Sequence, residues 1–122
     1  MLAGHMELIL WVTGLATAGA LVVCLAPVPV MKAVFGQSPP DALSLLIARH
    51  WGLLVSLVGA LLIYAAYYAE VRVPVLIIAI VEKVVIVLGL LLSPFRRRAP
   101  VLAIVLGDMG MAVVYLFYLA GF

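Results

Sequence analysis

The sequence predicts an all-α fold, an integral membrane four-helix transmembrane bundle that forms a single domain over residues 1–122. Three observations predict it. Hydrophobic residues make up 69% of the chain and charged residues 10%, whereas soluble domains are about half apolar and a quarter charged. The apolar residues gather in four runs, each reaching the roughly 20 residues that a helix needs to cross the hydrocarbon core. Lipid offers the backbone no hydrogen-bond partner, and the runs lack the short alternating strands of a barrel, so helices are expected.

The predicted helices cover residues 8–26, 42–68, 73–92 and 100–121. The first ends at Pro27 and the third at Ser93-Pro94, because proline cannot continue a helix. Ser38 or Asp41 is the candidate N-cap of the second. The first connection is the longest, and its middle is expected to lie flat on the membrane surface as a short amphipathic turn.

Basic residues in short loops set the orientation of a membrane protein. Lys32 and the run Arg96, Arg97 and Arg98 lie in the first and third loops, which share a side, whereas Arg72 is alone on the other side. We therefore expect the first and third loops in the cytoplasm and both termini outside. The arginine run lies between two apolar stretches, so its expected partner is an anionic lipid headgroup and not nucleic acid.

Five ionisable residues interrupt the predicted spans: Arg49, His50, Glu82, Lys83 and Asp108. Such residues are costly in lipid, and they usually face the bundle interior, pair with one another or mark a pathway. Counted from the cytoplasmic ends, each helix places one polar side chain roughly 10–15 Å deep: Thr17, Arg49, Glu82 and Asp108. We therefore expect one polar layer in the cytoplasmic half of the bundle.

With Lys83 included, the charges of this layer balance: Arg49 and Lys83 are cations, and Glu82 and Asp108 are anions. Such a neutral group is cheaper to bury than any one of its members. Glu82 and Lys83 are adjacent and are expected to point about 100° apart. One predicted arrangement pairs Glu82 with Arg49 and Lys83 with Asp108. In the alternative Lys83 snorkels to the interface, a long reach from near the midplane. Arg49 also shares a helix face with Gly52, Ser56, Gly59 and Ala60. Small residues let membrane helices approach closely, so Arg49 is expected to point at a neighbouring helix.

Three interpretations of the polar layer stay open. It forms a structural ion-pair network, a pocket for a small amphiphile, lipid or quinone headgroup, or a proton or ion path through Glu82 and Asp108. His50 would supply at most one metal or haem ligand per chain. Cys24 is the one cysteine, which excludes an intrachain disulfide and metal sites built from several thiolates. The sequence shows no serine or cysteine nucleophile with an obvious base, so an enzyme with a hydrolytic triad is not expected.

The second predicted span reads Arg49-His50-Trp51-Gly52 and then Gly59-Ala60, the third carries Glu82-Lys83, and the fourth carries Asp108. With the loop from Pro29 to Phe35-Gly36, this arrangement resembles the DoxX-like group of small bacterial four-helix membrane proteins. The resemblance implies a bundle in the bacterial inner membrane. Some members of the group are linked to membrane oxidoreductase assemblies and quinones. If the chain takes part in redox work, the resemblance implies a subunit or quinone-side partner, since the chain lacks a cysteine pair for thiol chemistry.

The sequence thus predicts a membrane-embedded binding or accessory protein. In this prediction Arg49 and Lys83 bind an acidic or carbonyl group, and Glu82 and Asp108 orient those cations. No resident cofactor is expected beyond a bound quinone or lipid. The expected partners are the lipid bilayer, anionic headgroups, and a second copy or a larger membrane complex. The alternatives are a small proton- or ion-coupled transporter or channel that acts as an oligomer, and a structural or chaperone-like subunit.

Overall fold

The computed structural model describes residues 2–122, which fold into helices and turns without a strand. Within these residues, four helical stretches are long and apolar enough to cross a membrane: Met6–Leu25, Ala42–Tyr67, Ala69–Leu91 and Ala99–Leu119. Their bounds lie within a few residues of the predicted ones. The all-α prediction and the four long apolar helices are therefore confirmed.

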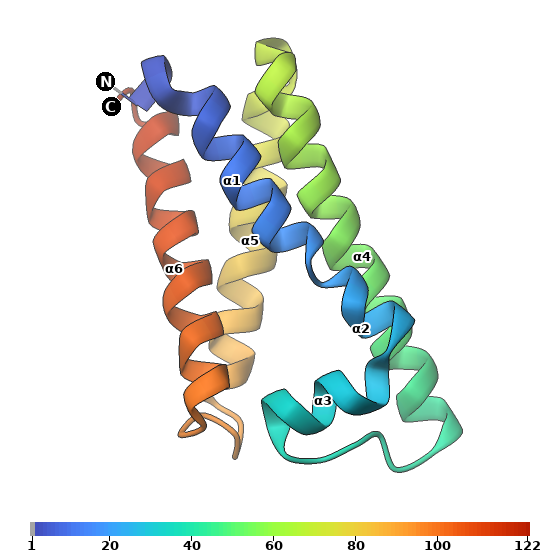
Figure 1. The fold of residues 1–122 in the computed structure, drawn as a ribbon. Coiled ribbons are helices and arrows are strands. Elements are labelled where there is room, and N and C mark those ends of the chain that lie inside the picture. The colour runs from blue at the N-terminus through green and yellow to red at the C-terminus, as the bar shows by residue number, and fades with distance from the viewer. Residues whose placement is uncertain (1) are drawn as a thin grey trace.

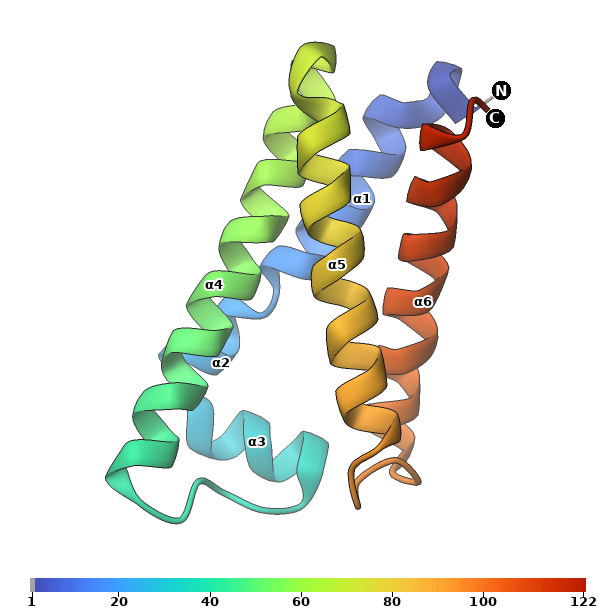
Figure 2. The same cartoon turned by 180° about the vertical axis from the view of Figure 1, so that it is seen from behind.

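The helices form two packed pairs. They are α1 (Met6–Ala18), α2 (Leu21–Leu25), α3 (Pro27–Phe35), α4 (Ala42–Tyr67), α5 (Arg72–Leu91) and α6 (Ala99–Leu119), with short 3-10 turns η1 (Leu2–His5) and η2 (Ala69–Val71). α1 and α2 pack along α4, α5 packs along α6, and α4 contacts α5. Both termini lie at one end of the molecule, and α3 and the α5–α6 loop lie at the other (Figures 1 and 2).

The contact between α4 and the α1–α2 stretch depends on small residues. Gly52, Ser56 and Gly59 are buried there. A Cβ added to Gly52 would lie 2.7 Å from the backbone nitrogen of Cys24. A Cβ on Gly59 would collide with the backbone of Ala18. The predicted small-residue contact is confirmed for these three positions, but Arg49 and Ala60, which were assigned to the same face, are exposed.

The first predicted helix, residues 8–26, is broken in two. Between α1 and α2 the hydrogen bonds tighten from the helical spacing to three residues: Ala20 N–H donates to Thr17 O at 3.1 Å, and Val22 N–H to Gly19 O at 3.1 Å. Glycine is a common cause of such a break because it stabilises a helix interior poorly. The prediction of one continuous helix was therefore wrong at Gly19-Ala20.

The first connection contains a helix where a flat turn was expected. Pro27 occupies the first turn of α3, where its missing N–H costs nothing, and Gly36 ends the helix in the left-handed region with φ 76°. Arg98 Nε donates to the carbonyl oxygen of Val34 at 2.9 Å. The Phe35 and Phe95 rings meet edge to face, with centroids 5.1 Å apart. These contacts hold α3 against the α5–α6 loop across one end of the bundle.

Side chains close both ends of α4. The carboxylate of Asp41 accepts from the Ser44 backbone N–H at 2.7 Å, which identifies Asp41 as the N-cap among the two candidates. Arg72 donates to the carbonyl oxygens of Ala65 and Ala66 at 2.8 and 2.9 Å. These carbonyls belong to the last turn of α4, which has no intrahelical donors left for them.

Two apolar clusters form the core. The larger one lies toward the termini and includes Met6, Leu10, Leu62, Leu76 and Tyr115. The smaller one lies toward α3 and consists of Val87, Leu90, Val101 and Val105. The polar residues of α5 and α6 fall between them in sequence and in space, so the polar site is flanked by packed apolar layers.

Candidate functional site

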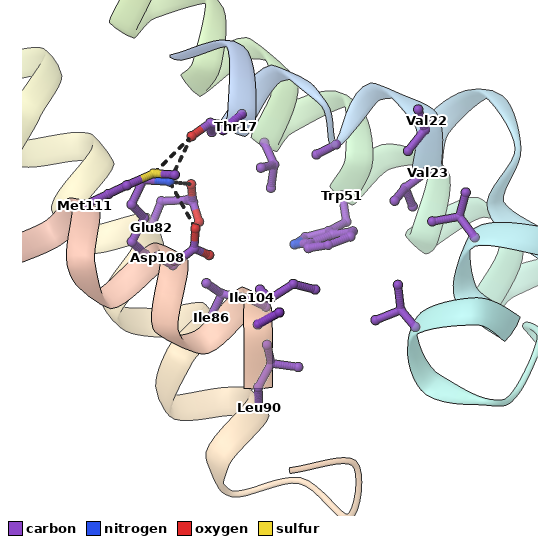
Figure 3. Close-up of a pocket in the computed structure, with 18 of the residues that line it drawn as sticks. Thr17, Val22, Val23, Trp51, Glu82, Ile86, Leu90, Ile104, Asp108 and Met111 are labelled. Carbon is purple, nitrogen blue, oxygen red and sulfur yellow. Dashed lines mark hydrogen bonds and ion pairs between the residues drawn. The ribbon is translucent and has the colours of Figure 1, made fainter. Parts of the chain in front are cut away.

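Lys83 is the centre of the site. It belongs to the buried face of α5 together with Ala79 and Val87, and it is only 1% exposed. Its Nζ lies 2.9 Å from Thr17 Oγ1, 3.3 Å from Asp108 Oδ1 and 3.9 Å from Glu82 Oε1 (Figure 3). The ammonium donates hydrogen bonds to Thr17 and Asp108, whereas Glu82 is a longer ion-pair partner. We refer to Thr17, Glu82, Lys83 and Asp108 as the Lys83 cluster.

Thr17 connects α1 to this cluster. It is buried, and its hydroxyl donates to the Thr13 carbonyl oxygen at 2.8 Å while accepting from Lys83. The same hydroxyl lies 3.8 Å from Met111 Sδ of α6. Thr17 is in the last turn of α1, just before the break, so α1 reaches the centre of the bundle at this point.

Two predictions about pairing were wrong. Arg49 does not pair with Glu82, because it is exposed and its Nη1 donates to the Cys24 carbonyl oxygen at 3.2 Å. Glu82 and Lys83 do share a direction at their ends, because the long lysine side chain bends toward both carboxylates. The predicted Lys83–Asp108 pair is confirmed.

Arg49 and His50 lie away from the cluster for a geometric reason. Toward its N-terminal end, α4 diverges from α5 and α6 (Figure 1). In the N-terminal part of α4, a residue at the same depth as the cluster is therefore still far from the centre of the bundle. Both side chains are exposed, and neither lines the central cavity.

The Lys83 cluster contains one cation and two carboxylates, which leaves one negative charge in excess when both acids are ionised. The predicted neutral layer relied on Arg49, which the structure places elsewhere. Glu82 Oε1 is also buried without a hydrogen-bond partner. A buried acceptor without a donor is costly, so the cluster is electrostatically incomplete.

A cavity of about 410 Å³ begins at this cluster and extends toward α3. The Lys83 cluster forms its polar end, and Trp51 of α4 lies farther along the lining (Figure 3). The remaining lining is mostly aliphatic, with contributions from Val23, Val30, Val34, Ile86, Leu90 and Ile104. The cavity therefore combines one polar end with an apolar body.

The cavity opens sideways, between the α1–α2 stretch and α6. Ala16 and Val22 line it from one side, Ala103 and Gly107 line it from the other, and all four are exposed. A Cβ added to Gly107 would have nothing within 4 Å. The mouth therefore lies on the flank of the bundle and not at either end.

Sequence reasoning missed three components of this site. Trp51 was noted only within a motif, Gly107 was assigned no role, and α3 was expected to be a surface turn. Counting residues from the helix ends gives the depth of a side chain, but it could not reveal a cavity, because a cavity depends on how the helices diverge. Within residues 2–122, no three His, Cys, Asp or Glu side chains gather to hold a metal ion.

Comparison with protein-family models, with curated proteins and with solved structures gives no match for this chain. The DoxX-like resemblance therefore stays a prediction. The functional inference rests on the cavity and its chemistry.

Proposed function

We propose that this chain is a multi-pass membrane protein that binds a small amphiphile, such as a lipid or quinone-like molecule, in its central cavity. One observation carries the proposal: the cavity of about 410 Å³ is polar at one end and apolar elsewhere. Ligand sites usually measure about 300–1,000 Å³ and pair a mostly apolar lining with a few polar groups. A mouth on the flank of the bundle supports entry from lipid.

The proposal includes an orientation in a bacterial inner membrane, with both termini outside. Lys32 and the arginine run 96–98 share one end of the molecule with α3, and Arg72 is at the other end. The excess of basic residues at the α3 end supports a cytoplasmic position for that end. The cavity then lies in the cytoplasmic half of the bundle.

A variant that fills the mouth tests the proposal. Gly107→Leu places a side chain in open space at the mouth, whereas Gly110→Leu places the same side chain on an exposed position of α6 that does not line the cavity. Native mass spectrometry in mild detergent is expected to show a defined adduct on the wild type and Gly110→Leu, and none on Gly107→Leu. A wild type without an adduct, or an adduct that survives in Gly107→Leu, contradicts the proposal.

The same native mass spectra test the revised site. Arg49 does not line the cavity. Arg49→Ala is therefore expected to retain the adduct. The prediction from sequence, which placed Arg49 in the binding site, expects this variant to lose it.

The charge imbalance of the Lys83 cluster supports a second candidate, proton-coupled transport. Two carboxylates beside one ammonium can take up a proton, and Glu82 Oε1 has no other donor. Four helices are thin for a pore, so this function needs an oligomer. It predicts a cross-linked dimer and a pH-dependent flux into liposomes that Glu82→Gln abolishes. A strict monomer without flux contradicts it.

A further inference from the structure

The polar end of the cavity does not offer a free cation. Lys83 is 1% exposed, and its ammonium is directed at Thr17, Asp108 and Glu82. An anionic or carbonyl ligand would have to displace one of these oxygens to reach it. The remaining cations at this end of the molecule lie outside the cavity. Arg49 donates to Cys24 and Arg98 donates to Val34, and the other three, Lys32, Arg96 and Arg97, are exposed.

The carboxylates, in contrast, are accessible from the cavity. The side chains of Glu82 and Asp108 both line it and are 19% and 20% exposed. In addition, Glu82 Oε1 has no hydrogen-bond donor. A ligand that enters the cavity therefore meets hydrogen-bond acceptors and an uncompensated negative charge.

We infer that the ligand is a lipophilic amine, in which a protonated amino head meets Glu82 and Asp108 and an apolar tail fills the aliphatic part of the cavity. The inference rests on the proposed function and names its ligand class. An ammonium head that meets the accessible parts of these two side chains makes the cluster neutral. Trp51 lines the same cavity farther from the carboxylates, on the side that the apolar tail would occupy. This ligand class is opposite to the acidic or carbonyl head that the sequence suggested.

Tryptophan quenching tests the inference. The chain has two tryptophans, and Trp11 lies outside the cavity, so Trp11→Phe leaves Trp51 as the only reporter. Bromoalkyl probes of one chain length and three heads, a primary amine, an alcohol and a carboxylate, are titrated near neutral pH. A charge-assisted hydrogen bond should let the amine quench Trp51 at a concentration about tenfold lower than the alcohol.

Matched variants assign the effect to the carboxylates. Glu82→Gln keeps the shape of the side chain, and it is expected to remove the preference for the amine while the alcohol still quenches. Asp108→Asn provides a second test at the other carboxylate if Glu82→Gln does not fold. Gly107→Leu is expected to abolish quenching by every probe, and Gly110→Leu to leave it unchanged.

The outcomes separate this inference from the proposal beneath it. An amine preference that disappears in Glu82→Gln or Asp108→Asn supports it. Equal quenching by all three heads, or a preference for the carboxylate, overturns the amine inference. The proposed binding cavity is still supported in that case if Gly107→Leu abolishes the quenching. Quenching that Gly107→Leu does not change overturns the proposed function as well.

Discussion

At the scale of single residues, Lys83 connects three helices through one side chain. Its ammonium contacts Thr17 of α1 and Asp108 of α6 from a backbone position on α5. Burying a charge is costly unless it is paired and hydrogen-bonded, and here two hydrogen bonds and two nearby carboxylates stabilise the ammonium. The structural and the ligand-binding interpretations of the polar layer are therefore compatible, because the same contacts that fix the helices also expose the carboxylates.

Lys83→Met is expected to destabilise the protein by about 3 kcal/mol, because it leaves two carboxylates without their cation. The loss should be at the lower end of the range for buried pairs, since each carboxylate side chain is about one-fifth exposed. Thermal unfolding in detergent, followed by circular dichroism, measures it. Lys32→Met is the control, because Lys32 is exposed on α3. Lys83→Met with wild-type stability would show that the cluster does not hold the helices together.

Asp41 gives a pH-dependent prediction. The backbone N–H of Ser44 donates to its carboxylate and holds the pKa of Asp41 below its ordinary value of 3.8. A lowered folded-state pKa means that the cap stabilises the protein fully above pH 3.8 and that this contribution is lost as the pH falls through the folded-state pKa. Asp41→Ala is therefore expected to lower the midpoint of thermal unfolding at neutral pH, and its difference from the wild type should become smaller in strong acid.

Asp41→Asn separates charge from capping. Asparagine is an equally good N-cap but does not titrate, so this variant should retain most of the stability at every pH. A constant difference between Asp41→Ala and the wild type across the acid range would contradict the role of the ionised cap.

At the scale of elements, α4 and the α1–α2 stretch touch backbone to backbone. Gly52 and Gly59 face Cys24 and Ala18 with no room for a side chain between the helices. Close approach of this kind lets van der Waals contacts substitute for the hydrophobic effect, which is weak between helices in lipid. This contact is consequently sensitive to single methyl groups.

Gly59→Val is expected to cost roughly 1–3 kcal/mol, because overpacking forces α1 away from α4. Gly89→Val is the matched control, since a Cβ at Gly89 meets nothing within 4 Å. Thermal unfolding of the two variants in the same detergent compares them. Equal midpoints for both would contradict the close contact seen at Gly59.

At the scale of the whole molecule, α3 closes the end of the cavity. Val34 contributes to the lining, and its carbonyl oxygen accepts from Arg98 of the α5–α6 loop. The arginine run was predicted to contact lipid headgroups. The structure gives Arg98 a protein partner, and Arg96 and Arg97 remain exposed, so the headgroup prediction stays open for those two.

Arg98→Gln is expected to loosen α3, because it removes the hydrogen bond that joins α3 to the α5–α6 loop. Hydrogen exchange of residues 27–35 should become faster, and water reaching the cavity should shift the emission of Trp51 to longer wavelength. Arg97→Gln, at an exposed neighbour, should change neither. Unchanged exchange in Arg98→Gln would show that the Phe35–Phe95 contact holds α3 by itself.

The sequence by itself determined the number, length and approximate bounds of the long helices, because an apolar run of about 20 residues reports a local property of the chain. It also predicted the Lys83–Asp108 pair and a small-residue face on which α4 meets a neighbouring helix, since helical spacing fixes which side chains share a face. The helix bounds depend on one helix at a time. The ion pair and the small-residue contact depend on two helices, and the spacing of residues along each helix indicates which of its sides faces the other.

Only the tertiary structure decided which polar residues meet. Arg49 has the predicted depth but lies where α4 diverges from its neighbours, so it contacts Cys24 and not Glu82. The break at Gly19-Ala20, the helix α3 and the cavity also depend on how the helices pack against one another. Depth along a helix is set by the local rise per residue, but the direction of a side chain toward a partner is set by crossing geometry, which no single segment contains.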